Sequence, residues 1–201
     1  MLKWLNQNKS VDGAATHFEQ GAELVRHGLY AEAVTEFKHA IRLEPKFTEA
    51  YLKLGSAYVA IERANEAIKA YSDALNVCPD SVEAYKQLGV IYDRAGKFLE
   101  ALKMFMKAIR LDPNDIELRN DLGMTYFNIG SYTESIKAYQ QALELDPQDG
   151  RAHYSLGLVY VDLNDKNSSL AEHQALQELG HKDLAKQLAE KIEAEFPTPA
   201  H

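Results

Sequence analysis

The sequence predicts an all-α fold in which pairs of helices repeat along the chain, and three spacings predict it. Four of the six prolines recur at one constant interval, at Pro45, Pro79, Pro113 and Pro147. Glycines recur at the same interval, at Gly21, Gly55, Gly89, Gly123 and Gly157. Alanines and aromatic residues share the interval, at Ala40, Ala74, Ala108 and Ala142 and at Phe37, Tyr71, Phe105 and Tyr139. The period is 34 residues, the distance from Pro45 to Pro79, and a fixed period of this length indicates an array of supersecondary units.

Each repeat unit is expected to hold two helices, as the third copy illustrates. Tyr85, Leu88 and Tyr92 lie at i, i+3 and i+7 and form one helical stripe. A second apolar stretch around Phe105 follows, and Pro113 ends it because proline cannot continue a helix. On this register the array spans residues 14–181, with units at 14–47, 48–81, 82–115, 116–149 and 150–181, the last of them degenerate.

The turns and helix starts carry matching residues. Glycine, and less readily asparagine, adopts the left-handed backbone conformation that is common just past a helix end. The sequence therefore predicts that first helices stop at Gly28, Gly96, Gly130 and Asn164. A side-chain oxygen just before a helix can accept hydrogen bonds from its free N–H groups. Such capping residues are predicted at Ser81, Asp115 and Asp149.

Glycines inside the first helices predict close packing between the two helices of a unit. A glycine there costs about 1 kcal/mol relative to alanine, so Gly55 and Gly89 are expected where a side chain would block the contact. Ala67 and Ala101 on the second helices are their expected counterparts, with Tyr or Phe filling the adjacent gaps. Ala101→Leu is expected to destabilise the fold by about 1–3 kcal/mol through overpacking.

The C-terminal segment predicts a helix that closes the array. Leu184, Leu188 and Ile192 lie at i, i+4 and i+8 among charged residues, which gives one apolar stripe and a solvated remainder. Such a helix suits the open end of a repeat array. We therefore expect a capping helix over 182–195 and a disordered tail over 196–201.

Residues 1–13 are expected to form an N-terminal arm ahead of the array. Leu2, Trp4 and Leu5 give this arm an apolar cluster. Three placements are open for it: it covers the first helix pair, it docks into the groove of another copy of the chain, or it is disordered.

Composition excludes several classes of protein. The 201 residues are 46% hydrophobic and 26% charged, which is the profile of an ordinary globular protein rather than a disordered or a membrane chain. The net charge of −8 disfavours nucleic-acid binding. One cysteine, Cys78, excludes an internal disulfide framework. No apolar run is long enough to span a membrane, and Met1–Lys9 forms no signal peptide, so we expect a cytoplasmic protein.

The repeating residues resemble the tetratricopeptide repeat, whose pattern is W-x2-L-G-x2-Y, then A-x3-F, then P, at the same period as in this chain. The second unit carries this pattern at Tyr51, Leu54, Gly55, Tyr58, Ala67, Tyr71, Ala74 and Pro79, and the third unit carries it at the equivalent positions. The first unit departs at His17 and Gln20, and the fourth at Arg119 and Ser135. End units are expected to be atypical because one side of them is unpacked.

The resemblance implies a right-handed α-α superhelix, here of about five helix pairs plus a C-terminal capping helix. In this family the first helices line a concave groove that commonly holds a peptide. The expected partner-binding residues are taken from the face of each first helix that lies opposite the seam, which is the contact between the two helices of a unit. These partner-binding residues are Leu52, Lys53, Ser56, Lys86, Gln87, Val90, Asn120, Asp121, Met124, Arg151, Tyr154 and Leu158.

We expect no catalytic, cofactor or metal site, and therefore no enzyme. The sequence has no HExxH, no glycine-rich phosphate loop after a strand and no GxSxG. His17 and His153 occupy the repeat position that holds Tyr51 and Tyr85 in other units, so they are expected to fill an aromatic packing slot rather than to bind a metal.

One subfamily of the tetratricopeptide proteins grips the C-terminal carboxylate of chaperones with a clamp of Lys, Asn, Asn, Lys and Arg from three successive units. No window of three units in this chain carries that set. Glu83, Glu117 and Asp121 lie at clamp positions, where they would repel a carboxylate. Chaperone peptides of the carboxylate-clamp kind are therefore not expected to bind tightly.

Together these features predict a non-catalytic scaffold that binds a peptide or protein segment in the groove. The alternative is a self-assembling structural module that oligomerises through its ends or its N-terminal arm. Nucleic acid is not an expected partner, because Lys53, Lys86 and Arg151 in the groove are mixed with acidic residues. The sequence leaves the identity of the partner and the oligomeric state open.

Overall fold

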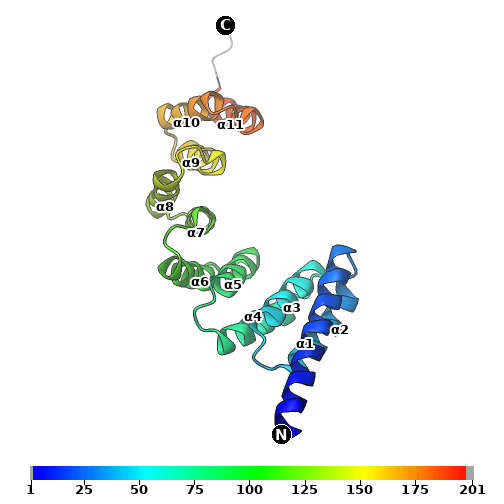
Figure 1. Cartoon of the computed structure of the whole chain (residues 1–201). Coiled ribbons are helices and arrows are strands. Elements are labelled where there is room, and N and C mark those ends of the chain that lie inside the picture. Colours follow the sequence, from blue (N-terminus) through cyan, green and yellow to red (C-terminus); the bar gives the residue numbers. More distant parts are fainter. Residues whose placement is uncertain (1, 198–201) are drawn as a thin grey trace. The chain divides into compact units, whose positions relative to one another are not determined.

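The computed structural model describes the backbone of residues 2–197 and the side chains of residues 13–197, and over this part of the chain it is all-α (Figure 1). The helices run α1 Leu2–Arg26, α2 Tyr30–Leu43, α3 Thr48–Ala60, α4 Ala64–Val77, α5 Val82–Arg94, α6 Phe98–Leu111, α7 Ile116–Asn128, α8 Tyr132–Leu145, α9 Gly150–Asp162, α10 Lys166–Glu178 and α11 Lys182–Glu195. From α3 to α9, the first helices of the units begin at the constant interval of the repeat, at Thr48, Val82, Ile116 and Gly150. The prediction of an all-α array of helix pairs is confirmed.

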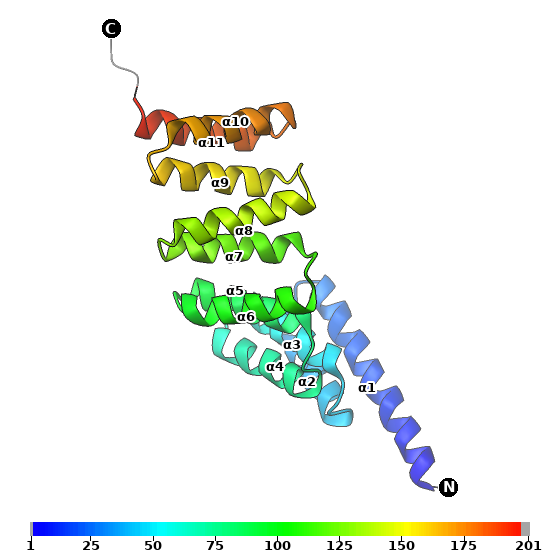
Figure 2. The same ribbon diagram turned by 90° about the vertical axis from the view of Figure 1, so that its left-hand side faces the viewer.

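The chain divides into two compact units, and the division falls inside α5, after Ile91. In unit 1, α1 packs on α2, α2 on α3, and α3 on α4. In unit 2, the helices from α6 to α11 each pack on the next, and α9 also contacts α7 and α11. Figure 2 shows α7, α8, α9 and α10 of unit 2 stacked one on another.

The recurring small and aromatic residues form the core of each unit. Ala40, Ala74, Ala108 and Ala142 are all fully buried, and the rings of Phe37, Tyr71, Phe105 and Tyr139 are buried as well. Side chains of one size at one repeat position keep adjacent helices at one distance, because protein interiors pack without voids.

The aromatic rings lie directly against the helix glycines. A Cβ on Gly55 would come within 2.6–2.8 Å of the Tyr71 ring, and one on Gly123 within 2.7–2.9 Å of the Tyr139 ring. The close approach predicted at these glycines is present. The nearest group on the facing helix is the ring, whereas we expected the alanine Ala67 to oppose Gly55.

The predicted turn residues have the expected backbone. Gly28, Gly96, Gly130 and Asn164 all have positive φ, between 61° and 75°. The equivalent residue of the second unit, Glu62, also has a positive φ of 59°. No residue preference indicated a turn at Glu62, because glutamate is costly in this conformation. Glu62 adopts this backbone conformation because the packing of helices α3 and α4 on either side fixes the position of the turn.

The predicted caps are confirmed. Asp115 accepts a hydrogen bond from the Leu118 N–H at 3.0 Å, and Asp149 accepts one from the Arg151 N–H at 2.9 Å. Ser81 accepts one from the Ala84 N–H at 3.3 Å.

Helix α11 closes unit 2 by packing on both α9 and α10. Leu188 and Ile192 are buried with Leu176 and Val161 in one cluster. Phe196 packs against this cluster too, so our prediction of a disordered tail from residue 196 is wrong for Phe196: its ring is large and apolar and finds a hydrophobic surface beside it. Residues 198–201 lie outside the described part of the chain.

At the other end, α1 is continuous from Leu2, so the backbone of the predicted N-terminal arm is helical from that residue on. The side chains of Leu2, Trp4 and Leu5 lie outside the described residues, and the three placements considered for them stay untested. None of the described helices has the length and apolar character needed to cross a bilayer.

Candidate functional site

In unit 1, the predicted partner-binding residues lie on α3 and α5. Lys53 is exposed, and Leu52 is partly exposed. Ser56 donates a hydrogen bond to the Leu52 carbonyl at 3.1 Å, and its hydroxyl lies 3.0 Å from that of Tyr71. This places Ser56 at the edge of the helix seam, between the buried ring and the solvent.

On α5, Lys86, Gln87 and Val90 are partly exposed. The Gln87 amide donates a hydrogen bond to the Glu83 carboxylate at 2.9 Å, one turn away. Lys86 and Val90 stand where α3 has Leu52 and Ser56, so each helix offers one partly exposed aliphatic side chain with polar side chains next to it.

In unit 2, Asp121 and Arg151 join two first helices. The Arg151 guanidinium lies 2.6 Å from the Asp121 carboxylate and links α9 to α7. Asp121 is only 14% exposed, whereas Arg151 is 48% exposed. Met124 is partly exposed on α7.

Asn120 does not lie where we predicted. Its side chain is buried at 3% exposure, and its amide donates a hydrogen bond to the Asp149 carboxylate. The Asn120 amide therefore ties α7 to the residue that caps α9, and it is not available to a partner. Our prediction assigned Asn120 to the open face from its angular position around the helix alone. The sequence did not show that the loop before α9 covers this position.

Tyr154 and Leu158 are also more covered than we expected. Both pack against the buried cluster shared by α9, α10 and α11. Part of each side chain is therefore used in packing, and the remainder is exposed.

A hollow in unit 1 was not predicted. It measures about 360 Å³ and lies among α2, α3 and α4. Tyr51, Leu54 and Tyr58 contribute to its lining, and the ammonium of Lys38 lies 5.4 Å from the centre of the Tyr58 ring. None of the predicted partner-binding residues lines it. Tyr51, Leu54 and Tyr58 are repeat positions that the pattern marked as packing alone, and charged side chains such as Glu66 and Asp73 complete the lining.

Burial raises the pKa of the two seam tyrosines. The pKa of Tyr139 is raised to about 12, mainly because the ring is removed from water, while hydrogen bonds with Ser155 and Ser135 oppose the shift. Burial raises the pKa of Tyr71 in the same way, and its hydrogen bond with Ser56 opposes it. Both groups stay neutral at physiological pH and act as hydrogen-bonding core residues.

Two histidines that we expected to serve as packing residues each pair with a glutamate. The Nδ1 atom of His17 lies 2.6 Å from the Glu36 carboxylate, and that of His153 lies 2.6 Å from the Glu172 carboxylate. Each pair joins the two helices of its unit. The ring of His17 also contacts the ring of His39 edge to face, with 5.1 Å between centroids.

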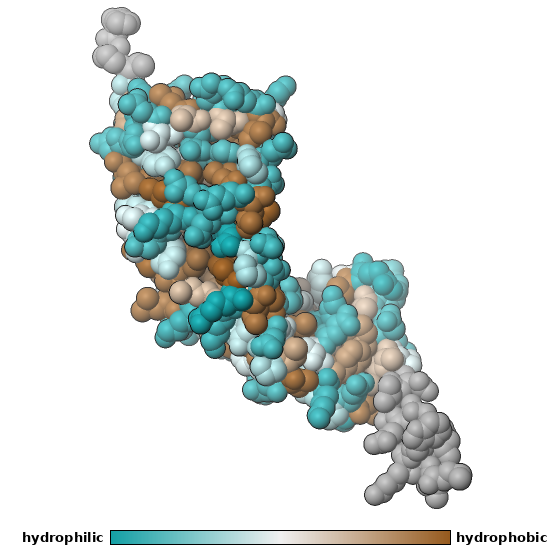
Figure 3. All heavy atoms as spheres, turned by 60° about the vertical axis from the view of Figure 1, so that its left-hand side comes forward, coloured by the Kyte–Doolittle hydropathy of each residue, from teal (hydrophilic) through white to brown (hydrophobic). Residues whose placement is uncertain are grey.

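On the face of the molecule drawn in Figure 3, hydrophilic residues separate the hydrophobic ones, so the apolar surface there is divided into small areas.

Comparisons with known families match the repeat pattern. A family model described as TPR repeat matches residues 21–61 and 123–164, and two described as tetratricopeptide repeat match residues 47–114 and 104–137. These matches run from residue 21 to residue 164 without a gap. No significant match was found among curated proteins.

Solved structures with similar folds include MamA and YrrB. A crystal structure of MamA is 25% identical, covers 81% of this chain and 95% of that one, and has a TM-score of 0.76. A structure of MamA from residue 41 onward, from Desulfovibrio magneticus RS-1, is 21% identical and covers 88% and 97% with a TM-score of 0.76. YrrB, described as a TPR protein with an unusual peptide-binding site, is 23% identical and covers 94% and 97% with a TM-score of 0.75.

Proposed function

Because this chain belongs to the tetratricopeptide repeat family, we propose that it is a non-catalytic scaffold that binds a peptide or protein segment on the open faces of its first helices. The observation that carries the proposal is made on α3 and α5 separately: Leu52 is partly exposed on α3 next to Lys53, and Val90 is partly exposed on α5, which also carries Lys86 and Gln87. Aliphatic side chains can receive apolar residues of a segment while the polar ones bind its backbone.

The similarity to YrrB supports a peptide as the partner, since that protein is described as having a peptide-binding site. In unit 2, taken by itself, Met124 on α7 and Arg151 on α9 have the same character. Asn120 is left out of the proposed surface because it is buried, and Tyr154 and Leu158 are left out because they pack against the core cluster.

Two solvent-accessible groups, Glu66 and Lys69, have pKa values shifted by their hydrogen-bond partners. Hydrogen bonds from its own backbone N–H and from Arg63 lower the pKa of Glu66, and a hydrogen bond with Asp73 raises the pKa of Lys69. Both shifts reinforce the charges that these groups carry in water. General acid–base catalysis at neutral pH uses the opposite shifts.

The single cysteine, Cys78, agrees with a protein of the reducing cytoplasm, where we place it.

The test is selection of peptides from a random display library, followed by measurement of the affinity of a selected peptide. Lys53→Glu/Lys86→Glu reverses two charges on the proposed surface of unit 1. We expect it to weaken binding about tenfold, which corresponds to about 1.4 kcal/mol. Lys103→Glu/Lys137→Glu is the matched control, because it makes the same change of charge at two exposed lysines of second helices.

Equal affinity of the wild type and the Lys53/Lys86 variant would contradict the proposed surface, and a library that yields no sequence-specific binder would contradict peptide binding itself. Circular dichroism spectra of both variants are the control that checks whether the helices remain.

Self-assembly is the second candidate, and the length of α1 favours it. This helix begins at Leu2, well before the first repeat unit at residue 14, whereas the other helices have 13 or 14 residues. A helical extension of this kind can pack on a second copy. Light scattering over a range of concentrations tests this with the full chain and with a variant lacking residues 2–12. Equal masses throughout would exclude this role for the extension.

A further inference from the structure

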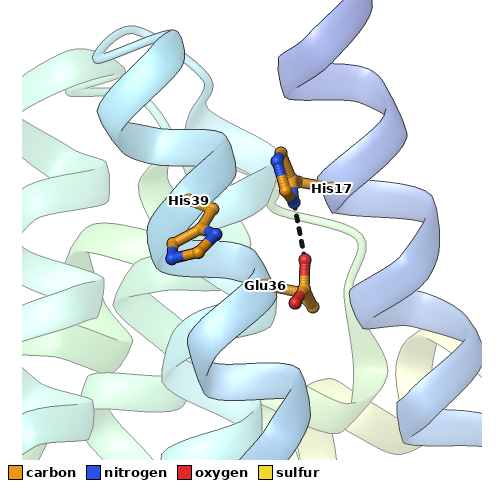
Figure 4. Close-up of side chains that lie close together, drawn as sticks. All are labelled: His17, Glu36 and His39. Atoms are coloured by element: carbon orange, nitrogen blue, oxygen red, sulfur yellow. Dashed lines mark hydrogen bonds and ion pairs between the residues drawn. The ribbon is translucent and has the colours of Figure 1, made fainter.

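Three side chains of the first helix pair converge, and the proposed scaffold role uses none of them. His17 projects from α1, and Glu36 and His39 project from the facing α2 (Figure 4). One potential ligand atom from each of the three lies within 4.8 Å of the other two. Among the described residues this is the one group of at least three His, Cys, Asp or Glu side chains with that spacing.

The local structure explains the convergence. Glu36 and His39 are three residues apart, so both lie on one face of α2. Packing of α1 on α2 brings His17 opposite them, and its Nδ1 atom is 2.6 Å from the Glu36 carboxylate. The side chains are 32% exposed for His17 and 24% for Glu36, so an ion can reach them from solvent. Glu36 also lines a surface hollow of about 330 Å³ together with Gln20.

We propose that His17, Glu36 and His39 form a binding site for a divalent transition-metal ion of the zinc class. Two imidazole nitrogens and one carboxylate oxygen are a donor set that Zn²⁺ accepts in proteins. The ion takes the place of the direct contact between His17 and Glu36. At metal–ligand distances of about 2.0–2.2 Å, tetrahedral ligands stand about 3.4 Å apart. The His17–Glu36 separation of 2.6 Å therefore has to open by less than an ångström, and the distances to His39, which are at most 4.8 Å, have to reach the same value.

The fifth helix pair is an internal reference for this site. His153 and Glu172 occupy the same repeat positions in the fifth pair as His17 and Glu36 in the first, and their atoms are separated by the same 2.6 Å. The residue equivalent to His39 is Ala175. The chain thus holds the same His–Glu pair with and without a third ligand, and it shows that a His–Glu pair alone already serves to join two helices.

A bound ion would join α1 to α2 through three bonds and leave its fourth position for water or for a donor atom of a partner. Binding to the folded state alone stabilises that state in proportion to the logarithm of the free metal concentration. The melting temperature of the chain is therefore expected to rise with added Zn²⁺.

The test is calorimetric titration of the full, tag-free chain with ZnCl2. We expect one ion per chain. His39→Ala should weaken binding at least about tenfold, since even loss of an outer ligand contact costs about 10- to 100-fold. Alanine occupies this position in the fifth pair, so the variant is expected to fold. His27→Ala is the matched control: it removes an exposed histidine paired with Glu23 and should leave binding unchanged.

Ala175→His supplies the third ligand beside His153 and Glu172 and should add a second ion. Titration with Co²⁺ gives an independent readout, because a tetrahedral site produces strong visible absorption and a purely structural His–Glu pair produces none. No binding of Zn²⁺ by the wild type, equal binding by His39→Ala, or a single ion in Ala175→His would each overturn the proposal.

Discussion

The helix pairs α7/α8 and α9/α10 bury the same glycine position by different means. In α7/α8, the Tyr139 ring of the second helix covers Gly123. In α9/α10, the residue equivalent to Tyr139 is His173, which is partly exposed. Gly157 is covered instead by Leu188, which comes from α11, with Glu172 beside it.

The difference teaches that the repeat requires the space over the glycine to be filled and does not require the second helix of the same pair to fill it. Where the aromatic residue is lost, the next helix supplies a branched aliphatic side chain. Helix α11 is therefore part of the core of the last pair, and the buried cluster of Leu176, Leu188 and Ile192 confirms this. Substitutions in both seams test how far the two are equivalent.

The largest effect is expected on removing the side chain over the glycine. Tyr139→Ala should lower the free energy of unfolding by about 3–5 kcal/mol, and Leu188→Ala by about 2–5 kcal/mol, because each leaves a cavity in a packed core. Denaturant titrations measure both. Leu184→Ala, at a partly exposed position of α11, is the control and should cost less. A loss below about 1 kcal/mol for Leu188→Ala, far under the usual cost of such a cavity, would show that α11 is peripheral.

A smaller effect is expected on adding a methyl group beneath these side chains. Gly123→Ala and Gly157→Ala should each destabilise by about 1–3 kcal/mol through overpacking. In a background of Tyr139→Ala, Gly123→Ala should instead be neutral or stabilising, because the ring is gone and alanine favours the helix by about 1 kcal/mol. The double-mutant cycle isolates this coupling. Additive effects would mean that the ring does not set the helix separation.

Substitutions in the turns that end the first helices are expected to change the stability of the chain by a smaller amount. Glu62→Gly is expected to stabilise the chain by about 1–2 kcal/mol, because it relieves a side chain held at positive φ. Asn164→Gly should stabilise less, since asparagine tolerates this backbone better. Thermal melts rank the two. Gly130→Ala, the converse change in α7/α8, should destabilise, and a stabilising result would contradict the argument.

The smallest effect at neutral pH is expected for the tyrosine hydroxyl, whose contribution to stability depends on pH only in alkali. The pKa of Tyr139 is about 12 in the fold and about 10 in the unfolded chain. Its contribution is complete below about pH 10 and is lost as the pH rises from about 10 to about 12, because the unfolded state loses its proton first. Tyr139→Phe should flatten this decline, as followed by circular dichroism against pH. Leu188 fills the other seam without an ionisable group, so Leu188→Met should leave the pH dependence unchanged.

The fold could be predicted from the sequence because the same residue types return at each packing position of the repeat. Gly96, Asp115 and Leu188 were each assigned a role from spacing alone, and the structure places them in those roles. Glu62 was missed because its position follows from the helices around it and not from its own preference.

The candidate site was only partly predictable. Helical angle selects a face, but it does not say what else covers that face, so Asn120 and Tyr154 were assigned to an open surface. The convergence of His17, Glu36 and His39 was missed because each residue was judged along the chain. The repeat positions of His17 and Glu36 face each other in the first helix pair, and the same positions face each other in the fifth pair as His153 and Glu172. A comparison of equivalent positions between the repeat units would have shown that these side chains meet.

Within the described part of each unit, the main helix contacts join helices one or two places apart along the chain. Contacts that are local in sequence close short loops and cost little chain entropy, so folding is expected to be fast for a chain of this length. For the same reason, a ribosome-bound chain can complete each helix pair soon after it emerges, without waiting for the C-terminal half. The last pair is the exception, because Gly157 meets Leu188 only after α11 has been synthesised.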